Sequence, residues 1–453
     1  MTKDLLCPIP WEMAAVKGNG DFRVCCHANV SKGRGLIQNG EKVLNCGRNE
    51  FSEMRNADTL KEVRVEMLKG NWHEFCGRCK VEEDSGIKSR RQKELELSAN
   101  NFSKEKALQW TKEDGEIDPS EFPLTRIDLR LGNKCNLKCR MCGPTDSDAW
   151  YSDHVSLWNV KSFEDTHGTV KLNLKNGRWH TKDSDYDWVD DSFFWNSFEQ
   201  IISNLEYIHL VGGEPLLIDN HMKVLEKCIE LDYAKGITLE YNTNLTVMPD
   251  QFLETWSHFK EVKIGISLDG VGEVNDYIRY PSKFSHIEEN IKKLSEYTKG
   301  NFTIWVSFTF QILNALSFKD FVLWKVKSEF YKPRGYFHKS VVSSHALHGP
   351  EFLSVQALPE KLKESFFQRL QKDIKDLKTE LTEIELKPEE IDHIVDKFKE
   401  AIHGYFEYMV KEDKSEHFPE LIRHIQKLDQ IRGQSVKDSL PEFFGALEAY
   451  LKD

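Results

Sequence analysis

The sequence lacks the features of a membrane or secreted protein. Among its 453 residues, no apolar stretch approaches the ~20 residues needed to span a bilayer. Its first residues, Met-Thr-Lys-Asp-Leu-Leu-Cys, contain no long apolar segment of the kind found in signal peptides. We therefore expect a cytoplasmic protein with no membrane partner.

An excess of positive charge is also absent. The 62 lysines and arginines are outnumbered by 74 acidic residues, which gives a formal net charge of −12. An acidic chain receives no general electrostatic help in binding phosphate backbones, so we expect no nucleic-acid partner. A basic run at residues 88–93 continues into Glu94 and Glu96 and is interpreted as a solvated helix face. The chain is long enough for two or three domains.

Cysteine is nearly absent from the later part of the chain. Nine of the ten cysteines lie within the first 142 residues, and in a reducing compartment such clustering favours metal ligands over disulfides. The exception, Cys228, occupies an apolar helical position beside Leu225 and is expected in the core.

Three of these cysteines have the spacing C-x3-C-x2-C and follow the strand-like run Arg126–Leu131. They are Cys135, Cys139 and Cys142. A cubane iron–sulfur cluster is normally held by four thiolates, so three would leave one iron open for a small molecule. Structural zinc is the alternative, but it requires four ligands, and no fourth Cys or His lies near Cys142. The trio therefore favours an iron–sulfur cluster.

A second motif, Gly212-Gly213-Glu214-Pro215, follows another apolar run. A glycine turn after a strand is common by itself, but the two motifs together resemble the radical SAM superfamily. That resemblance implies a [4Fe–4S] cluster on the cysteine trio, whose open iron binds the amino and carboxylate groups of S-adenosylmethionine (SAM). The Gly-Gly-Glu-Pro turn would receive the SAM amino group. Met141 departs from the family, where the residue before the third cysteine is usually aromatic.

Strand-like and amphipathic helical stretches alternate through the middle of the chain, which indicates βα units on a parallel sheet. Together with the resemblance, six such units predict an α/β fold: a partial (β/α)6 TIM-like barrel, with its chemistry at the C-terminal strand ends. A sixth strand is expected at Tyr336–Val342. The other expected strands are Arg126–Leu131, Tyr207–Val211, Gly236–Tyr241, Val262–Leu268 and Phe302–Phe310, and the helices between them are His221–Leu231, Gln251–His258 and His286–Lys299.

Polar residues at these strand ends are the candidate SAM contacts. In SPASM-type relatives, the residues that match Ser267 and Arg279 hold the ribose and the carboxylate of SAM, and the planar fork of arginine suits a carboxylate. Asn242 suits the ribose or the substrate, and Gln311 the ribose or the sulfonium side. Asp269 either orients Arg279, faces substrate, or only ends a strand in a turn.

The earlier cysteines, with Met54, Arg55 and Arg64 between them, resemble a SPASM/twitch auxiliary-cluster domain. Such domains usually follow the barrel, whereas this pattern precedes it. The resemblance implies an auxiliary [4Fe–4S] cluster, in which Cys26 or Cys46 could replace a ligand, and a zinc ribbon is the alternative. The expected ligands are Cys7, Cys25, Cys76 and Cys79.

The expected domains are an auxiliary-cluster domain (1–85), a linker helix (86–122), the barrel (123–349) and a helical C-terminal region (350–453). An aromatic-rich insertion at 143–204 contains a hairpin signal around Asn176-Gly177, and it either covers the cluster or packs a satellite core. The C-terminal region, although Leu428–Gly433 resembles the tail of twitch-domain proteins, is expected to be a helical bundle without chemistry.

The resemblance predicts an enzyme that receives an electron from a reductant such as flavodoxin or ferredoxin. It would cleave SAM to methionine and a 5′-deoxyadenosyl radical, which abstracts a hydrogen atom from substrate. Modification of a peptide or protein is the leading hypothesis. A small-molecule dehydrogenase or epimerase acting on aminoglycoside-like compounds, and a non-catalytic iron–sulfur protein, are the alternatives, because fold analogy alone does not identify a substrate.

Overall fold

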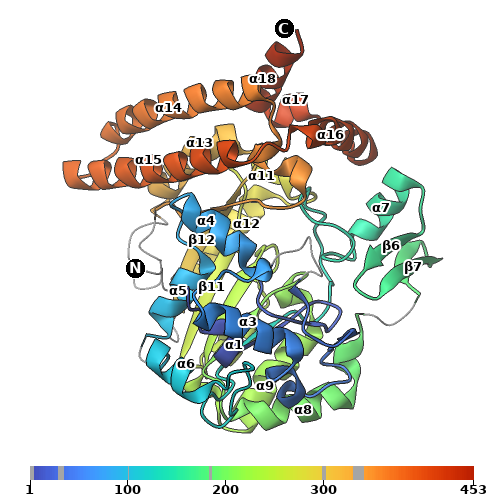
Figure 1. Cartoon of the computed structure of the whole chain (residues 1–453). Helices are drawn as coiled ribbons and strands as arrows, with labels where there is room; N and C mark the ends of the chain where they lie inside the picture. Colours follow the sequence, from blue (N-terminus) through green and yellow to red (C-terminus); the bar gives the residue numbers. More distant parts are fainter. Residues whose placement is uncertain are drawn as a thin grey trace. The chain divides into compact units, whose positions relative to one another are not determined.

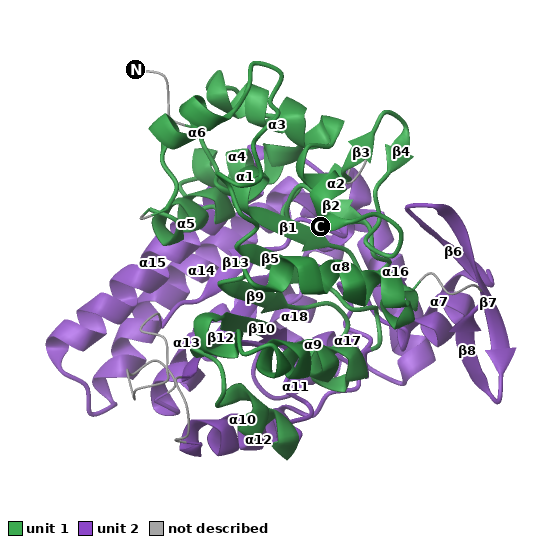
Figure 2. Ribbon diagram, turned by 90° about the horizontal axis from the view of Figure 1, so that it is seen from below, with its two compact units in different colours: residues 1–134, 183–241, 250–263 green, residues 135–182, 242–249, 264–453 purple. Residues whose placement is uncertain are grey.

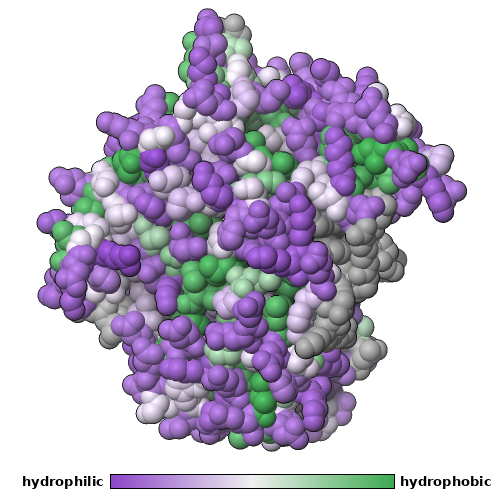
Figure 3. Space-filling model, turned by 180° about the vertical axis from the view of Figure 1, so that it is seen from behind, coloured by the Kyte–Doolittle hydropathy of each residue, from purple (hydrophilic) through white to green (hydrophobic). Residues whose placement is uncertain are grey.

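The computed structural model describes residues 5–28, 35–99, 101–182, 186–297, 302–329 and 341–452. The chain forms two compact units, which Figure 2 shows in different colours. Unit 1 comprises residues 1–134, 183–241 and 250–263, and unit 2 comprises residues 135–182, 242–249 and 264–453. The surface is mainly hydrophilic on the face drawn in Figure 3. Among the described residues, no helix has the length and apolar character needed to cross a membrane.

The central sheet is mostly parallel, which confirms the expected α/β fold class. Its strand order is β13-β12-β11-β10-β9-β5-β1-β2. Strand β9 pairs in parallel with both β5 and β10, and β12 pairs in parallel with β13. The five expected strands are present within about two residues, as β5 (Arg126–Leu129), β9 (Tyr207–Leu210), β10 (Thr238–Thr243), β11 (Glu261–Ser267) and β12 (Phe302–Phe310).

Three strands differ from the expectation. The sixth strand was expected at Tyr336–Val342, of which residues 336–340 lie outside the described residues, and the last strand is β13 (Ser344–Ala346). The N-terminal segment adds β1 (Met13–Val16) in parallel beside β5, and β2 (Phe22–Arg23) antiparallel to β1. Strand β1 is so short that its apolar run of four residues gave no recognisable period. The expected domain boundaries stay a prediction.

In unit 1, short helices surround this sheet (Figure 1). Helix α5 begins with a capping box, in which Ser89 and Gln92 satisfy each other's backbone amides. Helix α9 buries Val224, Leu225 and Cys228, which confirms that Cys228 is a core residue. The helices are α1 (Ile9–Glu12), α2 (Phe51–Arg55), α3 (Asp58–Leu68), α4 (Gly77–Asp84), α5 (Arg90–Leu97), α6 (Lys104–Trp110), α8 (Ser192–Ile202), α9 (Asp219–Glu230) and α10 (Asp250–Trp256); strands β3 (Gln38–Asn39) and β4 (Lys42–Val43) form a small hairpin.

In unit 2, long amphipathic helices follow the strands, and α14 and α15 lie side by side (Figure 1). The C-terminal region is therefore helical, as expected. Helix α16 ends at Gly433, whose φ of 63° is the left-handed conformation of a helix C-cap. The helices are α7 (Trp150–Trp158), α11 (Glu273–Ile278), α12 (Phe284–Glu296), α13 (Phe318–Lys327), α14 (Glu360–Thr382), α15 (Pro388–Lys411), α16 (Phe418–Arg432), α17 (Val436–Ser439) and α18 (Pro441–Lys452).

The aromatic insertion is divided between the units. Residues 143–182 belong to unit 2 and contain α7 and a three-stranded sheet of β6 (Ser162–Asp165), β7 (Gly168–Lys175) and β8 (Arg178–Thr181). The predicted hairpin is confirmed, and Asn176 and Gly177 both have positive φ, as a tight hairpin turn requires. Later aromatics pack within unit 1, where Trp188 and Phe194 have ring centroids 5.0 Å apart. Trp188 and Phe194 are therefore part of the core of unit 1.

Candidate functional site

The three cysteines of the C-x3-C-x2-C motif lie in one loop that follows β5. The Cys142 thiol donates a hydrogen bond to the sulfur of Cys139, which lowers the pKa of Cys139 and raises the pKa of Cys142. The charge of Cys135 also acts on Cys142. The Cys139 and Cys142 sulfurs are therefore in hydrogen-bond contact, and Cys135 lies in the same loop.

The backbone of this loop is fixed by groups further along unit 2. Asp148 accepts a hydrogen bond from the Cys135 amide (2.8 Å), and Ser147 donates to the carbonyl of Leu137 (2.7 Å). The Trp150 indole donates to the carbonyl of Cys139 (2.9 Å). These bonds fix the backbone of the loop, so the protein itself sets the positions of the three cysteines.

Asn244 lies beside the first cysteine. Its side-chain nitrogen is 3.9 Å from the Cys135 sulfur and 3.2 Å from the side-chain oxygen of Asn136. The expected SAM contact on this strand was Asn242, which lies over Gly265: a Cβ at Gly265 would be 2.8 Å from the Asn242 oxygen. The two asparagines are two residues apart on or just after β10, so the sequence motif Tyr-Asn-Thr-Asn did not distinguish them.

Asp269 and Arg279 form a buried ion pair, with 2.7 Å between a carboxylate oxygen and Nε. Asp269 also accepts a hydrogen bond from the Thr309 amide of β12 (2.9 Å). Burial lowers the pKa of Arg279, but Asp269 and the Cys139 and Cys142 thiolates outweigh it, so its pKa lies above the ordinary value. Of the interpretations left open for Asp269, the geometry supports the one in which it orients Arg279.

Gln311 is fully buried, and neither its amide oxygen nor its amide nitrogen has a hydrogen-bond partner among the described residues. A buried amide without partners costs free energy unless a ligand satisfies it. Both groups therefore fit a polar ligand such as SAM. Ser267, at the end of β11, is partly exposed.

The Gly-Gly-Glu-Pro turn belongs to unit 1. Gly212 and Gly213 have φ of 87° and 53°, and a Cβ on Gly213 would lie 2.2 Å from the Lys134 carbonyl oxygen. That same oxygen accepts a hydrogen bond from the Glu214 amide (2.8 Å). Two glycines are required because the turn packs directly on the segment that leads into Cys135. Pro215 follows at the start of a short 3-10 helix.

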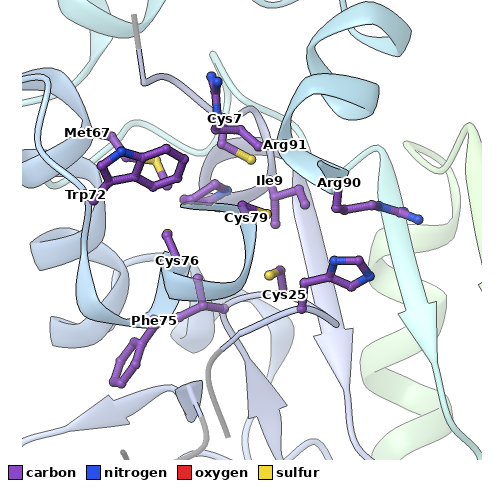
Figure 4. Close-up of a pocket in the computed structure, with 13 residues that line it drawn as sticks. Cys7, Ile9, Cys25, Met67, Trp72, Phe75, Cys76, Cys79, Arg90 and Arg91 are labelled. Atoms are coloured by element: carbon purple, nitrogen blue, oxygen red, sulfur yellow. The ribbon is translucent and has the colours of Figure 1, made fainter. Parts of the chain in front are cut away.

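The expected auxiliary ligands, Cys7, Cys25, Cys76 and Cys79, line one pocket in unit 1 (Figure 4). They come from three separate segments of the chain. Arg64, from α3, holds the first segment by donating from Nη2 to the carbonyl of Pro10 (2.8 Å). Apolar and aromatic side chains complete the wall: Ile9, Pro10, Val24, Met67, Trp72 and Phe75.

The electrostatics of this quartet suit a cation. Burial, together with the charge of Cys79, raises the pKa of Cys76 to about 12, and burial raises the pKa of Cys7 and Cys25. Four neighbouring thiolates repel one another, and only a positively charged centre would make them all stable. Arg91 adds one positive charge and is fixed by Glu83 (2.7 Å).

Cys26 and Cys46, the two cysteines that could replace a ligand of the quartet, do not line the pocket. Cys46 is fully buried, and after burial the charge of Asp21 is the main cause of its raised pKa. Cys26 responds to the charges of Arg90, Asp128 and Arg130, so it faces another environment. Close to the pocket, one ligand atom each from His27, Cys79 and Glu82 lie within 4.8 Å of one another, so this region also contains a set of groups suited to zinc.

Sequence reasoning missed a polar row across the unit 1 sheet. Strand register places Asp128 beside His209, and His209 beside Glu240. Nδ1 of His209 is 2.7 Å from Asp128. Its buried Nε2 is 3.9 Å from Glu240 and has no hydrogen-bond partner within the described part of the chain. The signal was present, because Arg126-Ile-Asp-Leu-Arg130 alternates where a strand buried on both faces would be apolar throughout.

Residues 129–310 match the sequence model of the Radical SAM superfamily. This part of the chain is therefore similar to a radical SAM domain. Such a domain implies a [4Fe–4S] cluster and SAM, and the cysteine trio and the buried side-chain amide of Gln311 fit both groups.

No curated protein matches the chain. Solved structures with a similar fold include native anSMEcpe with bound AdoMet, with 17% identity, a TM-score of 0.35, and coverage of 56% of this chain and 58% of that chain. Streptococcus suis SuiB bound to S-adenosylmethionine has 15% identity and a TM-score of 0.33, and covers 74% of this chain and 66% of its own. SuiB bound to precursor peptide SuiA has 15% identity and a TM-score of 0.28, with coverage of 63% and 57%. The matches span less than two thirds of each of these chains.

Proposed function

We propose that the protein reductively cleaves SAM at a [4Fe–4S] cluster on Cys135, Cys139 and Cys142 and abstracts a hydrogen atom from a peptide or protein substrate. The observation that carries this proposal is a short loop with three cysteines whose backbone is held by Asp148, Ser147 and Trp150. When bound, the cluster supplies one electron to the SAM sulfonium. Flavodoxin or ferredoxin is the proposed reductant.

The chain's own residues would hold SAM. Arg279, fixed by Asp269, offers a planar fork to the SAM carboxylate. Gln311 has an unsatisfied amide for the ribose or the sulfonium side, and Ser267 and Asn242 offer further hydrogen-bonding groups at the strand ends. Gly212 and Gly213 bend the backbone so that the turn presents Glu214 and Pro215. Asn244 joins this set because it contacts Cys135.

We place an auxiliary [4Fe–4S] cluster on the cysteine quartet, in a SPASM/twitch-type module. Four thiols on a pocket with apolar walls supply the full ligand set of a closed cluster. Because every iron would be ligated by protein, this cluster would pass electrons rather than bind SAM.

A second candidate function is the modification of a small, strongly polar molecule. The Asp128–His209–Glu240 row and the neighbouring Arg90 and Arg130 supply charged groups of both signs, which favour a compact polar substrate. Asp128 fixes the imidazole through Nδ1 and leaves Nε2 for a substrate group.

The test is anaerobic reconstitution with iron, sulfide, SAM and dithionite. We expect methionine and 5′-deoxyadenosine from the natural chain and neither from the C135A/C139A/C142A variant. Cys228→Ala is the matched control, because this buried cysteine is a core residue and should keep the activity. Zinc in place of iron, or iron content that the triple variant leaves unchanged, would contradict the proposal.

The two substrate classes are separated by what accelerates 5′-deoxyadenosine formation: a pool of synthetic peptides, or a panel of aminosugars and amino acids. His209→Asn should abolish the acceleration and leave uncoupled SAM cleavage intact if the polar row binds substrate.

A further inference from the structure

The cluster loop has a partner far along the chain, in helix α16. Asp429 of this helix is 2.6 Å from a guanidinium nitrogen of Arg140, the residue directly after Cys139. Arg140 also donates from Nε to the carbonyl of Tyr277 (3.0 Å), and the Tyr277 hydroxyl donates to Asp429 (2.8 Å). Leu428 packs with Trp150, and Cys142 packs against them. All these residues belong to unit 2, so α16 is part of the framework of the loop.

Arg432 lies one turn after Leu428, at the end of α16, and its side chain is fully buried. Its Nε is 2.8 Å from Asp153, and its guanidinium lies between two rings, 4.9 Å from Trp150 and 5.1 Å from Tyr280. Its other two nitrogens, Nη1 and Nη2, have no hydrogen-bond partner among the described residues. Unpaired N–H groups of a buried cation are costly unless an acceptor is supplied.

The acceptor that pairs with Arg432, Asp153, does not neutralise its surroundings. Asp153 is shared with Lys138, whose Nζ is 2.7 Å from the other carboxylate oxygen. Two positive charges therefore meet one negative charge beside the loop. Arg432 lies next to the cluster loop, because its guanidinium faces Trp150, whose indole donates to the Cys139 carbonyl (2.9 Å). His424 cannot add charge, since burial and the charges of Arg140 and Arg432 lower its pKa to about 3.

We propose that Arg432 is a positioning residue for the cluster on Cys135, Cys139 and Cys142, whose charge stabilises the reduced cluster and whose free N–H groups serve its sulfur acceptors. This inference rests on the proposed function. A cluster with three thiolates becomes more negative when it takes up an electron, and a buried positive charge nearby favours that state. Hydrogen bonds to cluster sulfurs act in the same direction. The helical C-terminal region would then contribute to the chemistry, contrary to the expectation from sequence.

The test compares Arg432→Gln, which removes the charge, with Arg432→Lys, which keeps it. Arg423→Gln is the matched control, because Arg423 is an exposed arginine of the same helix. The reconstituted full chain is titrated with dithionite and followed by electron paramagnetic resonance. Only the signal that changes when SAM is added is analysed, since a cluster with an open iron responds to SAM.

At a fixed ambient potential we expect Arg432→Gln to lower the ratio of reduced to oxidised cluster about tenfold, a midpoint shift of about 59 mV for a one-electron couple. Arg432→Lys should stay within about twofold of the natural chain, and Arg423→Gln should equal it. An unchanged midpoint in Arg432→Gln would overturn the inference. If that variant folds but holds no cluster, Arg432→Lys decides: normal loading and midpoint support the inference, and failure to load overturns it.

A different result identifies failure of the proposed function itself. If the natural chain shows no signal that responds to SAM, the cluster assignment is wrong before any variant is compared. If the natural chain shows a signal that responds to SAM, but Arg432→Gln and Arg423→Gln have the same midpoint, only the role of Arg432 is wrong.

Discussion

The two cysteine sites are built in opposite ways. The trio lies on one short loop and is surrounded by polar groups, among them Asn244 and the Asp269–Arg279 pair of unit 2. The quartet gathers three distant segments of unit 1 around a pocket with apolar and aromatic walls. A local set of three ligands leaves room for an exchangeable fourth, whereas four ligands from separate segments also fasten those segments together.

Because of this difference, we expect the trio to serve mainly the chemistry and the quartet also to serve the stability of the fold. The trio's loop is already held by hydrogen bonds from Asp148, Ser147 and Trp150, so its fold does not need the cluster. Buried arginines, such as Arg64, hold the N-terminal segment that carries Cys7. The four thiols of the quartet, however, repel one another once they are ionised. We therefore expect metal to contribute to the folding of the quartet region much more than to the folding of the trio's loop.

The largest expected effect comes from breaking the quartet. Cys76→Ala with Cys79→Ala should remove about half of the iron, since each [4Fe–4S] cluster holds four irons. It should also lower the thermal stability, because α4 and the Cys7 segment lose their shared ligand. Uncoupled cleavage of SAM should persist, because it needs only the trio. Iron analysis, thermal unfolding and 5′-deoxyadenosine formation check the three statements. Loss of SAM cleavage in a folded variant would show that the two sites are not separable.

A smaller effect is expected at the turn that the resemblance assigns to SAM. Gly213→Ala places a Cβ 2.2 Å from the Lys134 carbonyl oxygen, at a φ of 53°. The turn must move, at a cost of more than about 1 kcal/mol, so SAM should bind at least about fivefold more weakly. Iron content should not change, because no ligand is removed. Equilibrium binding of SAM measures the effect.

Gly236→Ala is the control for this substitution, since a Cβ there meets no atom within 4 Å and Gly236 has no positive φ. Equal SAM affinity in the two alanine variants would remove the turn from the SAM site.

Helices and strands could be predicted from the sequence wherever their apolar residues repeat with a clear helical or strand period. Strand β12 (Phe302–Phe310) alternates buried and partly buried residues and was predicted to the residue. The long amphipathic helices α14 and α15 lie in the C-terminal region that was expected to be helical. Strand β1 was missed because four apolar residues fit a strand or a helix equally well.

The residues of the candidate site could be predicted where their spacing along the sequence identifies them. They could not be predicted where the pairing of distant strands brings them together. Local spacing named the trio, and the structure places the Cys139 and Cys142 sulfurs in hydrogen-bond contact. That the trio holds a cluster stays a prediction. The Asp128–His209–Glu240 row depends on which residues of three strands face one another, and that is set by long-range pairing. The contacts of Asp429 and Arg432 with the cluster loop join residues almost 300 positions apart, as the separation of 289 for Arg140 and Asp429 shows. No local pattern contains that information.

The smallest expected effect concerns the two cysteines outside the quartet. Cys46 is fully buried, its amide donates to the carbonyl of Gly20 (2.9 Å), and Asp21 is the charge that acts on its thiol. Cys46→Ala should therefore leave the iron content unchanged and cost only the small loss of packing from one sulfur, about 1 kcal/mol. Cys26→Ala should also keep its iron, because Cys26 does not line the pocket of the quartet. Cys25→Ala, one residue away, should lose the auxiliary cluster, because Cys25 lines that pocket with Cys7, Cys76 and Cys79. If Cys26→Ala loses iron and Cys25→Ala keeps it, Cys26 rather than Cys25 is the ligand, and the proposed quartet is wrong at this position.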